Sequence, residues 1–235
     1  MLCFPPAGGS AQPYRAWSKL LPAHIGVVAV ELPGHGSRMG EPPVDTLPGL
    51  IAGGLLGEVK TLLDRPLVVF GHSMGAIVGT ELSRLLLTDV GWRPLLLVAA
   101  GCGSPDLPSV PDYETRMTDE GILAFLRQVG GTPASILDNE EYLAMLRPVV
   151  RADFESIAHR DLAASPRLGC PVRAYVGDAD PRVDRERAAG WEIEGNGDFE
   201  LCTFPGGHFF VQERVDMVLS RLQRDIGDAL RARPA

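Results

Sequence analysis

The 235-residue sequence has no apolar run long enough to cross a membrane and no basic run of the kind that binds nucleic acid. No stretch of eighteen apolar residues occurs, and the first residues do not combine a basic segment with an apolar one. We therefore expect no membrane span and no export signal, and a cytoplasmic protein. Lysine and arginine number 22 against 30 acidic residues, which gives a net charge of −8. Without a basic–aromatic patch, nucleic acid is not an expected partner.

Cysteine is scarce and scattered. The four cysteines lie far apart, each in or beside an apolar segment: Cys3, Cys102, Cys170 and Cys202. No CxxC pair and no cysteine–histidine spacing typical of a metal site is present. We therefore expect reduced, buried thiols rather than disulfides or zinc ligands, with no metal site and no cofactor.

Short apolar segments alternate with helical patterns along the chain. Strand character is seen in the opening residues and in five later segments: 27–30, 67–70, 95–99, 172–176 and 200–204. Near-continuous apolar strands separated by helices predict an α/β fold, with a mostly parallel sheet covered by helices on both faces. The last helix is the clearest, with apolar residues at three- and four-residue spacings: Val215, Leu219, Leu222, Ile226 and Leu230. The length favours a single domain over residues 1–235.

Residues from about 104 to 165 interrupt this alternation, because they contain no strand-like segment. One helix is predicted at 119–129, with its apolar residues on one face and Gly130 after it. A second is predicted at 138–157, where Pro148 favours a kink or a break. A helical insertion of this length after a central strand is typical of a lid over an active site. An ordinary pair of crossover helices is the alternative.

The most informative motif is Gly71-His72-Ser73-Met74-Gly75, which separates an apolar strand from a segment rich in helix formers. A Gly-x-Ser-x-Gly corner in that setting is a nucleophile elbow, whose tight turn strains the serine backbone and whose glycines permit close packing. The serine hydroxyl then stands at a helix N-terminus, where free N–H groups favour developing negative charge. We predict that Ser73 is a catalytic nucleophile; a merely structural glycine turn is the alternative.

A serine nucleophile needs a base and an acid that orients the base. In a strand–helix architecture the chain order is serine, acid, histidine. His208, in a glycine-rich loop after the last predicted strand, is the expected base, whereas His159 lies in the helical insertion and is the weaker candidate. Asp180 is the expected acid, because it lies deeper in the loop after its strand than the alternative, Asp178.

Two backbone N–H groups are predicted to form an oxyanion hole: Met74, directly after the nucleophile, and Ala7, in the glycine-bearing loop after the first strand. A phosphate-binding loop is the alternative for that segment, but no Gly-Lys-Ser/Thr follows it. Residues 32–40 look like a dinucleotide loop, yet their third glycine is one residue late and Pro42-Pro43 prevent the required helix. We interpret them as a turn at the rim of the active site.

With these motifs in this order, the sequence resembles the type II thioesterases, the stand-alone editing thioesterases of polyketide and non-ribosomal peptide assembly lines. The resemblance covers nearly the whole chain, and its blocks follow the order usual in that family: 3–17, 31–38, 71–75, 146–153, 177–181 and 205–210. One departure is Pro6, where the family usually has histidine.

The resemblance implies an α/β-hydrolase with a mobile helical lid over an acyl chamber. It implies Ser73, Asp180 and His208 as a catalytic triad, with Ala7 and Met74 as oxyanion donors. The implied reaction is hydrolysis of aberrant or stalled acyl thioesters on the phosphopantetheine arm of an acyl carrier protein or a peptidyl carrier protein, through an acyl-serine intermediate. A general small-molecule serine esterase and a non-catalytic module that binds carrier proteins are the alternatives.

Carrier proteins are commonly acidic, and this chain is itself net negative, so long-range attraction cannot drive their docking. A local basic patch is therefore expected near the chamber mouth. Three arginines of the helical insertion are candidates: Arg147, Arg151 and Arg160. A solvated charged face is the alternative.

Overall fold

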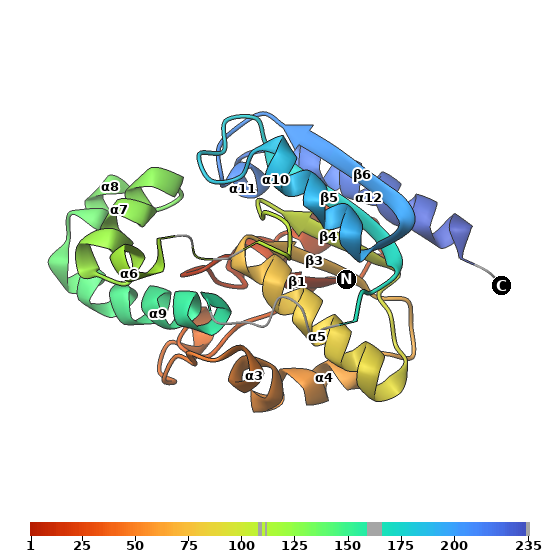
Figure 1. Ribbon diagram of the computed structural model, residues 1–235, viewed down its shortest axis with the longest axis horizontal. Helices are drawn as coiled ribbons and strands as arrows, with labels where there is room; N and C mark the ends of the chain where they lie inside the picture. The colour runs from red at the N-terminus through yellow and green to blue at the C-terminus, as the bar shows by residue number, and fades with distance from the viewer. Residues whose placement is uncertain (108–109, 111, 159–165, 234–235) are drawn as a thin grey trace.

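The computed structural model describes residues 1–107, 110, 112–158 and 166–233, and Figure 1 shows a central sheet between helices. Six strands pair in parallel in the order β2-β1-β3-β4-β5-β6. They are β1 (Leu2–Phe4), β2 (Val28–Ala29), β3 (Val68–His72), β4 (Leu96–Ala100), β5 (Cys170–Gly177) and β6 (Gly195–Phe204). The expected α/β fold with a parallel sheet is confirmed, and each segment predicted as a strand contributes one.

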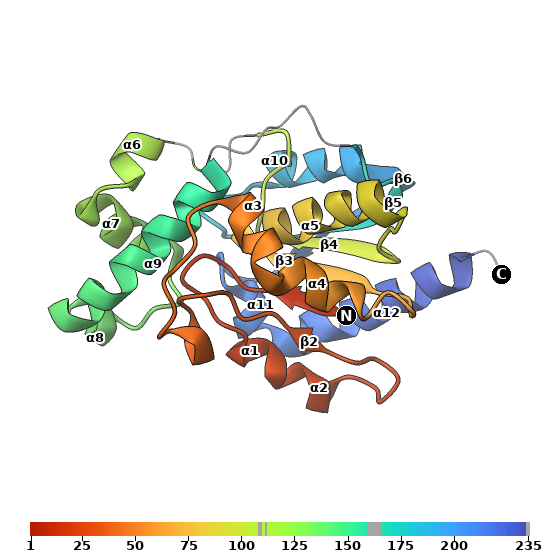
Figure 2. The same ribbon diagram turned by 90° about the horizontal axis from the view of Figure 1, so that it is seen from below.

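Helices cover both faces of the sheet, as Figure 2 shows. One layer holds α3 (Leu47–Leu50), α4 (Leu56–Lys60), α5 (Met74–Val90) and α10 (Arg185–Ala189). The opposite layer holds α1 (Gln12–Arg15), α2 (Trp17–Leu20) and α12 (Val215–Ala232), with the short α11 (Phe210–Glu213) before it. Three further short turns of helix are η1 (Gly36–Arg38), η2 (Ile51–Leu55) and η3 (Gly190–Glu194).

Strand side chains alternate between two apolar cores, because successive residues of a strand point to opposite faces. Val69 belongs to the core beneath α5, together with Leu97 of the next strand. Val68 and Phe70 belong to the core beneath α12. Burial on both faces explains why the strands are apolar at nearly every position instead of at every second one.

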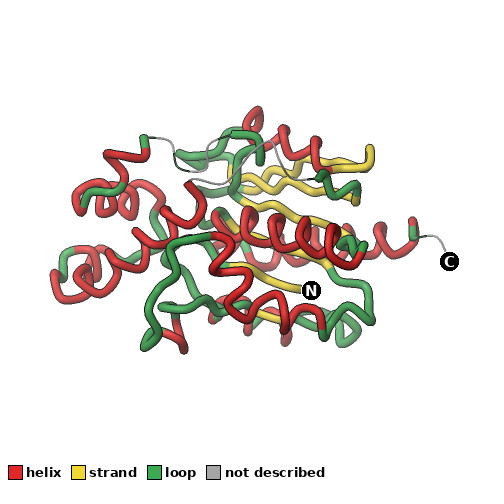
Figure 3. The backbone as a smooth tube through the Cα atoms, turned by 60° about the horizontal axis from the view of Figure 1, so that its bottom comes forward, coloured by secondary structure: helices red, strands yellow, loops and turns green. Residues whose placement is uncertain are grey.

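A group of helices fills the connection between β4 and β5, at the end of the sheet where the parallel strands finish (Figure 3). Its members are α6 (Tyr113–Arg116), α7 (Asp119–Val129), α8 (Ala134–Leu137) and α9 (Glu140–Ala158). The bounds of α7 are those predicted: Thr118 caps it by accepting the N–H of Gly121 at 3.0 Å, and Gly130, with φ of 75°, follows its end. By contrast, α9 continues through Pro148, so no break occurs there.

All four cysteines are free thiols, and burial raises the pKa of Cys3 to about 12. Within the described ranges, no helix is both long enough and apolar enough to cross a lipid bilayer.

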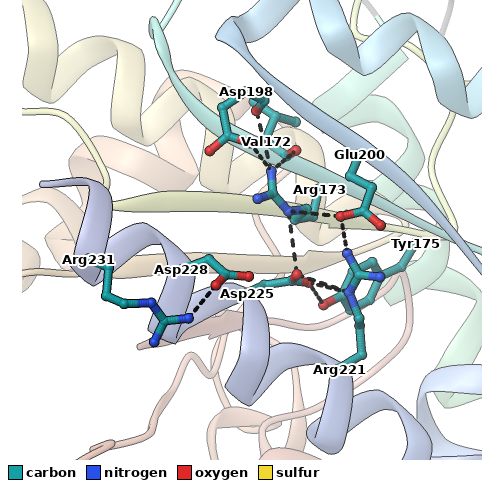
Figure 4. Close-up of polar contacts among 9 residues, drawn as sticks. All are labelled: Val172, Arg173, Tyr175, Asp198, Glu200, Arg221, Asp225, Asp228 and Arg231. Carbon is teal, nitrogen blue, oxygen red and sulfur yellow. Dashed lines mark hydrogen bonds and ion pairs between the residues drawn. The ribbon is translucent and has the colours of Figure 1, made fainter.

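A buried ionic cluster fastens α12 to the last two strands (Figure 4). Asp225 of α12, 1% exposed, accepts a hydrogen bond from the Tyr175 hydroxyl and another from Nε of Arg221 at 2.9 Å. Its Oδ1 also lies 3.4 Å from Nε of Arg173, which pairs in turn with Asp198 at 2.8 Å. One buried carboxylate thus serves two guanidinium groups and a phenol.

We expect Asp225→Ala to lower the free energy of unfolding by about 3 kcal/mol, because it strips a buried partner from Arg173. This loss is at the low end of the range for a broken buried ion pair, because Arg173 keeps its ion pair with Asp198. Asp228→Ala is the matched control on the same helix, because the Asp228–Arg231 pair is exposed and should contribute less than about 0.5 kcal/mol. Urea unfolding followed by circular dichroism measures both, and equal losses would contradict the expectation.

Candidate active site

The turn between β3 and α5 holds Ser73 in a strained backbone conformation, with φ of 54° and ψ of −119°. Residues other than glycine rarely adopt a positive φ. A Cβ atom at Gly71 would lie 2.3 Å from the backbone of Ala76, and one at Gly75 would lie 2.3 Å from the carbonyl oxygen of Phe4. Only glycine fits on either side of Ser73, so the backbone has the form expected of a nucleophile elbow.

His208 lies in the loop between β6 and α11, and its Nδ1 is 2.8 Å from Oδ2 of Asp180. Both side chains are buried, at 3% and 0% exposed. Because the carboxylate can only accept, Nδ1–H donates and the lone pair of Nε2 is left to receive a proton. Asp178 has a different partner: its Oδ1 accepts the N–H of Gly206 at 2.9 Å. The structure therefore brings Asp180, and not Asp178, to His208.

Two cavities share Ala7, Ser73 and His208 in their walls. The smaller, of about 60 Å³, is closed on the helical side by Phe125, Phe154 and Ile157. The larger, of about 200 Å³, borders the loop of residues 6–10, and its helical side is formed by Phe125, Leu126, Val129 and Leu146. The apolar faces of α7 and α9 thus line both cavities.

The two N–H groups predicted for the oxyanion hole flank this space. Met74 is the first residue of α5, so its N–H has no acceptor inside the helix. The two amides that follow Ala7 in its loop are engaged: Gly9 N–H donates to the Pro6 carbonyl at 2.9 Å, and Gly8 N–H donates to Asp153 at 2.7 Å. The backbone is therefore held immediately after Ala7.

His72 is a buried residue for which the sequence suggested no role. Its Nε2–H donates to the carbonyl oxygen of His208 at 2.8 Å, and the two rings lie 5.2 Å apart. Burial, followed by the nearby His208, lowers the pKa of His72 to about 3, so its ring is neutral. It holds the backbone of His208 instead of exchanging protons. The only sequence signal for the contact of His72 with the His208 carbonyl is a histidine at the end of an apolar strand, directly before the elbow serine.

The arginines expected to form a docking patch are engaged inside the helical group. Arg147 pairs with Glu140, and Arg151 pairs with Asp119 while donating from Nε to the carbonyl of Met117. Arg151 therefore fastens α9 to the start of α7. The remaining candidate, Arg160, lies outside the described residues, as does His159.

The thioesterase domain family matches residues 1–226. The chain belongs to this family. Thioesterase PikA5 of Streptomyces venezuelae is 32% identical, over 98% of this chain and 80% of its own length. The solved structure of the type II thioesterase BorB, from the borrelidin biosynthetic cluster, is 31% identical with a TM-score of 0.83, covering 96% of this chain and 91% of that one. The expected resemblance to type II thioesterases is confirmed, and the protein is a thioester hydrolase of the α/β-hydrolase fold.

One relative of this thioesterase has a different name: linear gramicidin dehydrogenase LgrE of Brevibacillus parabrevis, 35% identical over 92% of this chain and 83% of its own length. In this chain the glycine-bearing turn of residues 32–40 leads only into the single turn η1 (Gly36–Arg38). A dinucleotide site needs a helix directly after its glycines, to receive the pyrophosphate. The turn of residues 32–40 therefore lacks the helix that a dinucleotide-binding loop needs.

The two aspartates of the β5 loop provide a direct test of the His208 partner. We expect Asp180→Asn to lower kcat for an acyl-pantetheine thioester roughly 10⁴-fold, because the amide favours the wrong imidazole tautomer. Asp178→Asn is the matched control, since an amide oxygen can still accept the Gly206 N–H, and kcat should change little. Thiol release measured with a chromogenic disulfide compares them. The reverse ranking would assign the acid to Asp178.

Proposed function

We propose that this thioesterase removes aberrant or stalled acyl groups from the phosphopantetheine arm of an acyl or peptidyl carrier protein, with Ser73 as the nucleophile. The observation that carries the proposal is the shared lining of two cavities by Ser73, His208 and Ala7, beneath apolar helices. Solved structures similar to this chain include ClbQ and the type II thioesterase YbtT, each from a pathway that combines non-ribosomal peptide and polyketide synthesis, and they support a carrier-bound substrate. The four free thiols support a reducing compartment such as the cytoplasm.

In the proposed mechanism, the Ser73 hydroxyl attacks the thioester carbonyl while Nε2 of His208 takes its proton. The N–H groups of Ala7 and Met74 stabilise the oxyanion, and Asp180 stabilises the imidazolium. Collapse of the tetrahedral intermediate breaks the C–S bond, and the departing pantetheine sulfur takes the proton from the His208 imidazolium, which returns Nε2 to its neutral form. A thiol has a pKa near about 8.5, so the thiolate leaves with less help from a general acid than an amine. Water deprotonated by His208 then hydrolyses the acyl-serine.

We further propose that α6 to α9 act as the lid of this site. Phe125 of α7 and Phe154 of α9 meet edge to face, with centroids 4.8 Å apart, in the wall of the smaller cavity. At about 60 Å³ that cavity has room for a short acyl group. A longer acyl chain would have to occupy the larger cavity of about 200 Å³, or these helices would have to move away from the sheet.

A moving lid predicts faster amide exchange in α7 and α9 than in β3, because local opening exposes their backbone without unfolding the sheet. Hydrogen exchange followed by mass spectrometry at neutral pH measures this difference. Addition of a non-hydrolysable acyl-pantetheine analogue should slow exchange in both helices. Protection of α7 and α9 equal to that of β3 would contradict the lid.

Two arginines beside Phe125, a residue in the wall of the smaller cavity, are our candidates for contacting the phosphate of the arm. The guanidinium groups of Arg116 and Arg182 lie 5.1 and 5.3 Å from the Phe125 ring centroid. In the part of the chain that the structure describes, neither forms an ion pair. Burial, followed by repulsion from Arg116, lowers the pKa of Arg182 to about 10. Asp112 acts on both arginines from a distance, and Asp180 acts on Arg182, but neither carboxylate forms an ion pair with them. Half-buried cations that are not paired directly are costly, and an anionic ligand would relieve that cost.

We expect Arg182→Gln to raise KM roughly tenfold for an acyl-phosphopantetheine and to leave KM for the same acyl-pantetheine, which lacks the phosphate, nearly unchanged. The magnitude is that of one charge-assisted hydrogen bond. Arg151→Gln is the matched control, because that guanidinium already pairs with Asp119. Steady-state kinetics on the two substrates decide the matter. Equal changes on both would mean that Arg182 shapes the cavity instead of binding phosphate.

A further inference from the structure

A second buried histidine lies close to the oxyanion loop but outside the proposed triad. His35, 4% exposed, follows β2 in the turn that precedes η1. Its Nδ1 is 2.9 Å from the carbonyl oxygen of Pro33, and its Nε2 is 2.9 Å from Oδ2 of Asp153 in α9. A carbonyl only accepts, so Nδ1 carries hydrogen. The second contact then needs one more proton, between Nε2 and Oδ2.

The same carboxylate oxygen holds the oxyanion loop. Oδ2 of Asp153 accepts the N–H of Gly8 at 2.7 Å, one residue after Ala7. Gly8 has φ of +67°, and a Cβ atom there would lie 2.9 Å from Cγ2 of Val150 on the same helix. Gly8 is therefore held against α9 by a hydrogen bond and by close packing, and no other residue fits in its place.

The charges around His35 favour its protonated form. Burial opposes the charge, but the hydrogen bond and the charge of Asp153, the Pro33 carbonyl and the more distant Glu31 together raise its pKa above the ordinary 6.5. Glu31 also accepts the N–H of Ala11 at 2.8 Å, so it fastens the far end of the loop. Its other partners, Arg15 at 3.7 Å and Ser37 at 3.2 Å, lie on its exposed side.

We propose that His35 and Asp153 are positioning residues for the oxyanion hole, holding Gly8, and with it the N–H of Ala7, against α9 while a proton lies between their side chains. This inference rests on the proposed role of Ala7. When the proton leaves, one contact of the neutral ring fails. If Nδ1 keeps its hydrogen, the lone pair of Nε2 faces the Asp153 carboxylate; if Nε2 keeps its hydrogen, the Pro33 carbonyl loses its donor. The pair couples the oxyanion loop to α9 while it holds this proton and releases the loop once the proton is lost.

The sign of the pH dependence follows from the raised pKa. The contribution of the pair to holding the loop is fully present below pH 6.5, the ordinary pKa of histidine. It is lost as the pH rises through the raised pKa of His35 in the folded protein. Turnover should therefore fall as the pH rises through the raised pKa of His35. Replacing Asp153 by asparagine removes the charge that favours the imidazolium, so the fall should move to lower pH.

Two substitutions separate the contacts of His35. In His35→Gln the amide nitrogen lies near the former Nε2 and can donate to Asp153 without titrating. In His35→Asn the amide nitrogen lies near the former Nδ1 and reaches only the carbonyl oxygen of Pro33. With a short p-nitrophenyl ester, which needs no carrier protein, we expect His35→Gln to keep kcat within about threefold and to lose the alkaline fall. His35→Asn should lower kcat roughly 10- to 100-fold with KM nearly unchanged, the cost of a misplaced catalytic group.

Arg127→Gln, which removes an exposed ion pair with Asp138 within the helical group, is the control and should behave as wild type. NMR titration of the His35 ring, in wild type and Asp153→Asn, reads the proton without any turnover. Identical pH profiles for wild type, His35→Gln and Asp153→Asn, or a His35 ring that titrates at or below 6.5, would overturn the inference. Ester hydrolysis with no thioester hydrolysis would instead overturn the proposed function and leave this inference standing.

Discussion

The proposed site depends on the tight packing of backbone against backbone where β3 turns into α5, beside the end of β1. At Gly71 and at Gly75 a single added carbon would lie 2.3 Å from neighbouring backbone atoms. That contact leaves Ser73 at the tip of the turn with a positive φ and sets Met74 as the first residue of the helix. Every other element of the proposed site is arranged around a serine whose position is decided by backbone packing rather than by its own side-chain contacts.

The loops that surround Ser73 are held by buried polar contacts, each linking segments far apart in the chain. Asp180 holds the ring of His208, His72 holds the His208 carbonyl, and Asp153 holds Gly8. The side chains of Asp180, His208, His72 and Asp153 are nearly inaccessible to water. In such a buried environment a hydrogen bond is stronger and an unpaired polar atom costs more. The proposed catalytic geometry and the local stability of the loops therefore depend on the same hydrogen bonds.

The helical group between β4 and β5 contributes to this site in two ways. Its apolar faces line the cavities, with Phe125 and Phe154 in contact across α7 and α9. Its buried carboxylate, Asp153, reaches the loop that carries Ala7. Motion of α9 would therefore change both the space for an acyl group and the backbone that is proposed to receive the oxyanion. A moving lid would thus be linked to the chemistry through this one helix.

Local patterns in the sequence determined the strands, the glycine corner at Ser73, the bounds of α7 and the choice of His208 and Asp180 as candidates. These features depend on residues close together in the chain, through apolar periodicity, turn chemistry and capping. Of the kink or break expected at Pro148, the break does not occur, because α9 continues through that residue. Only the tertiary structure decided that Arg151 pairs with Asp119, that His72 holds His208, and that His35 meets Asp153. Those pairings join residues 32 to 136 positions apart, and no local pattern specifies which buried polar groups the fold will bring within 3 Å of each other.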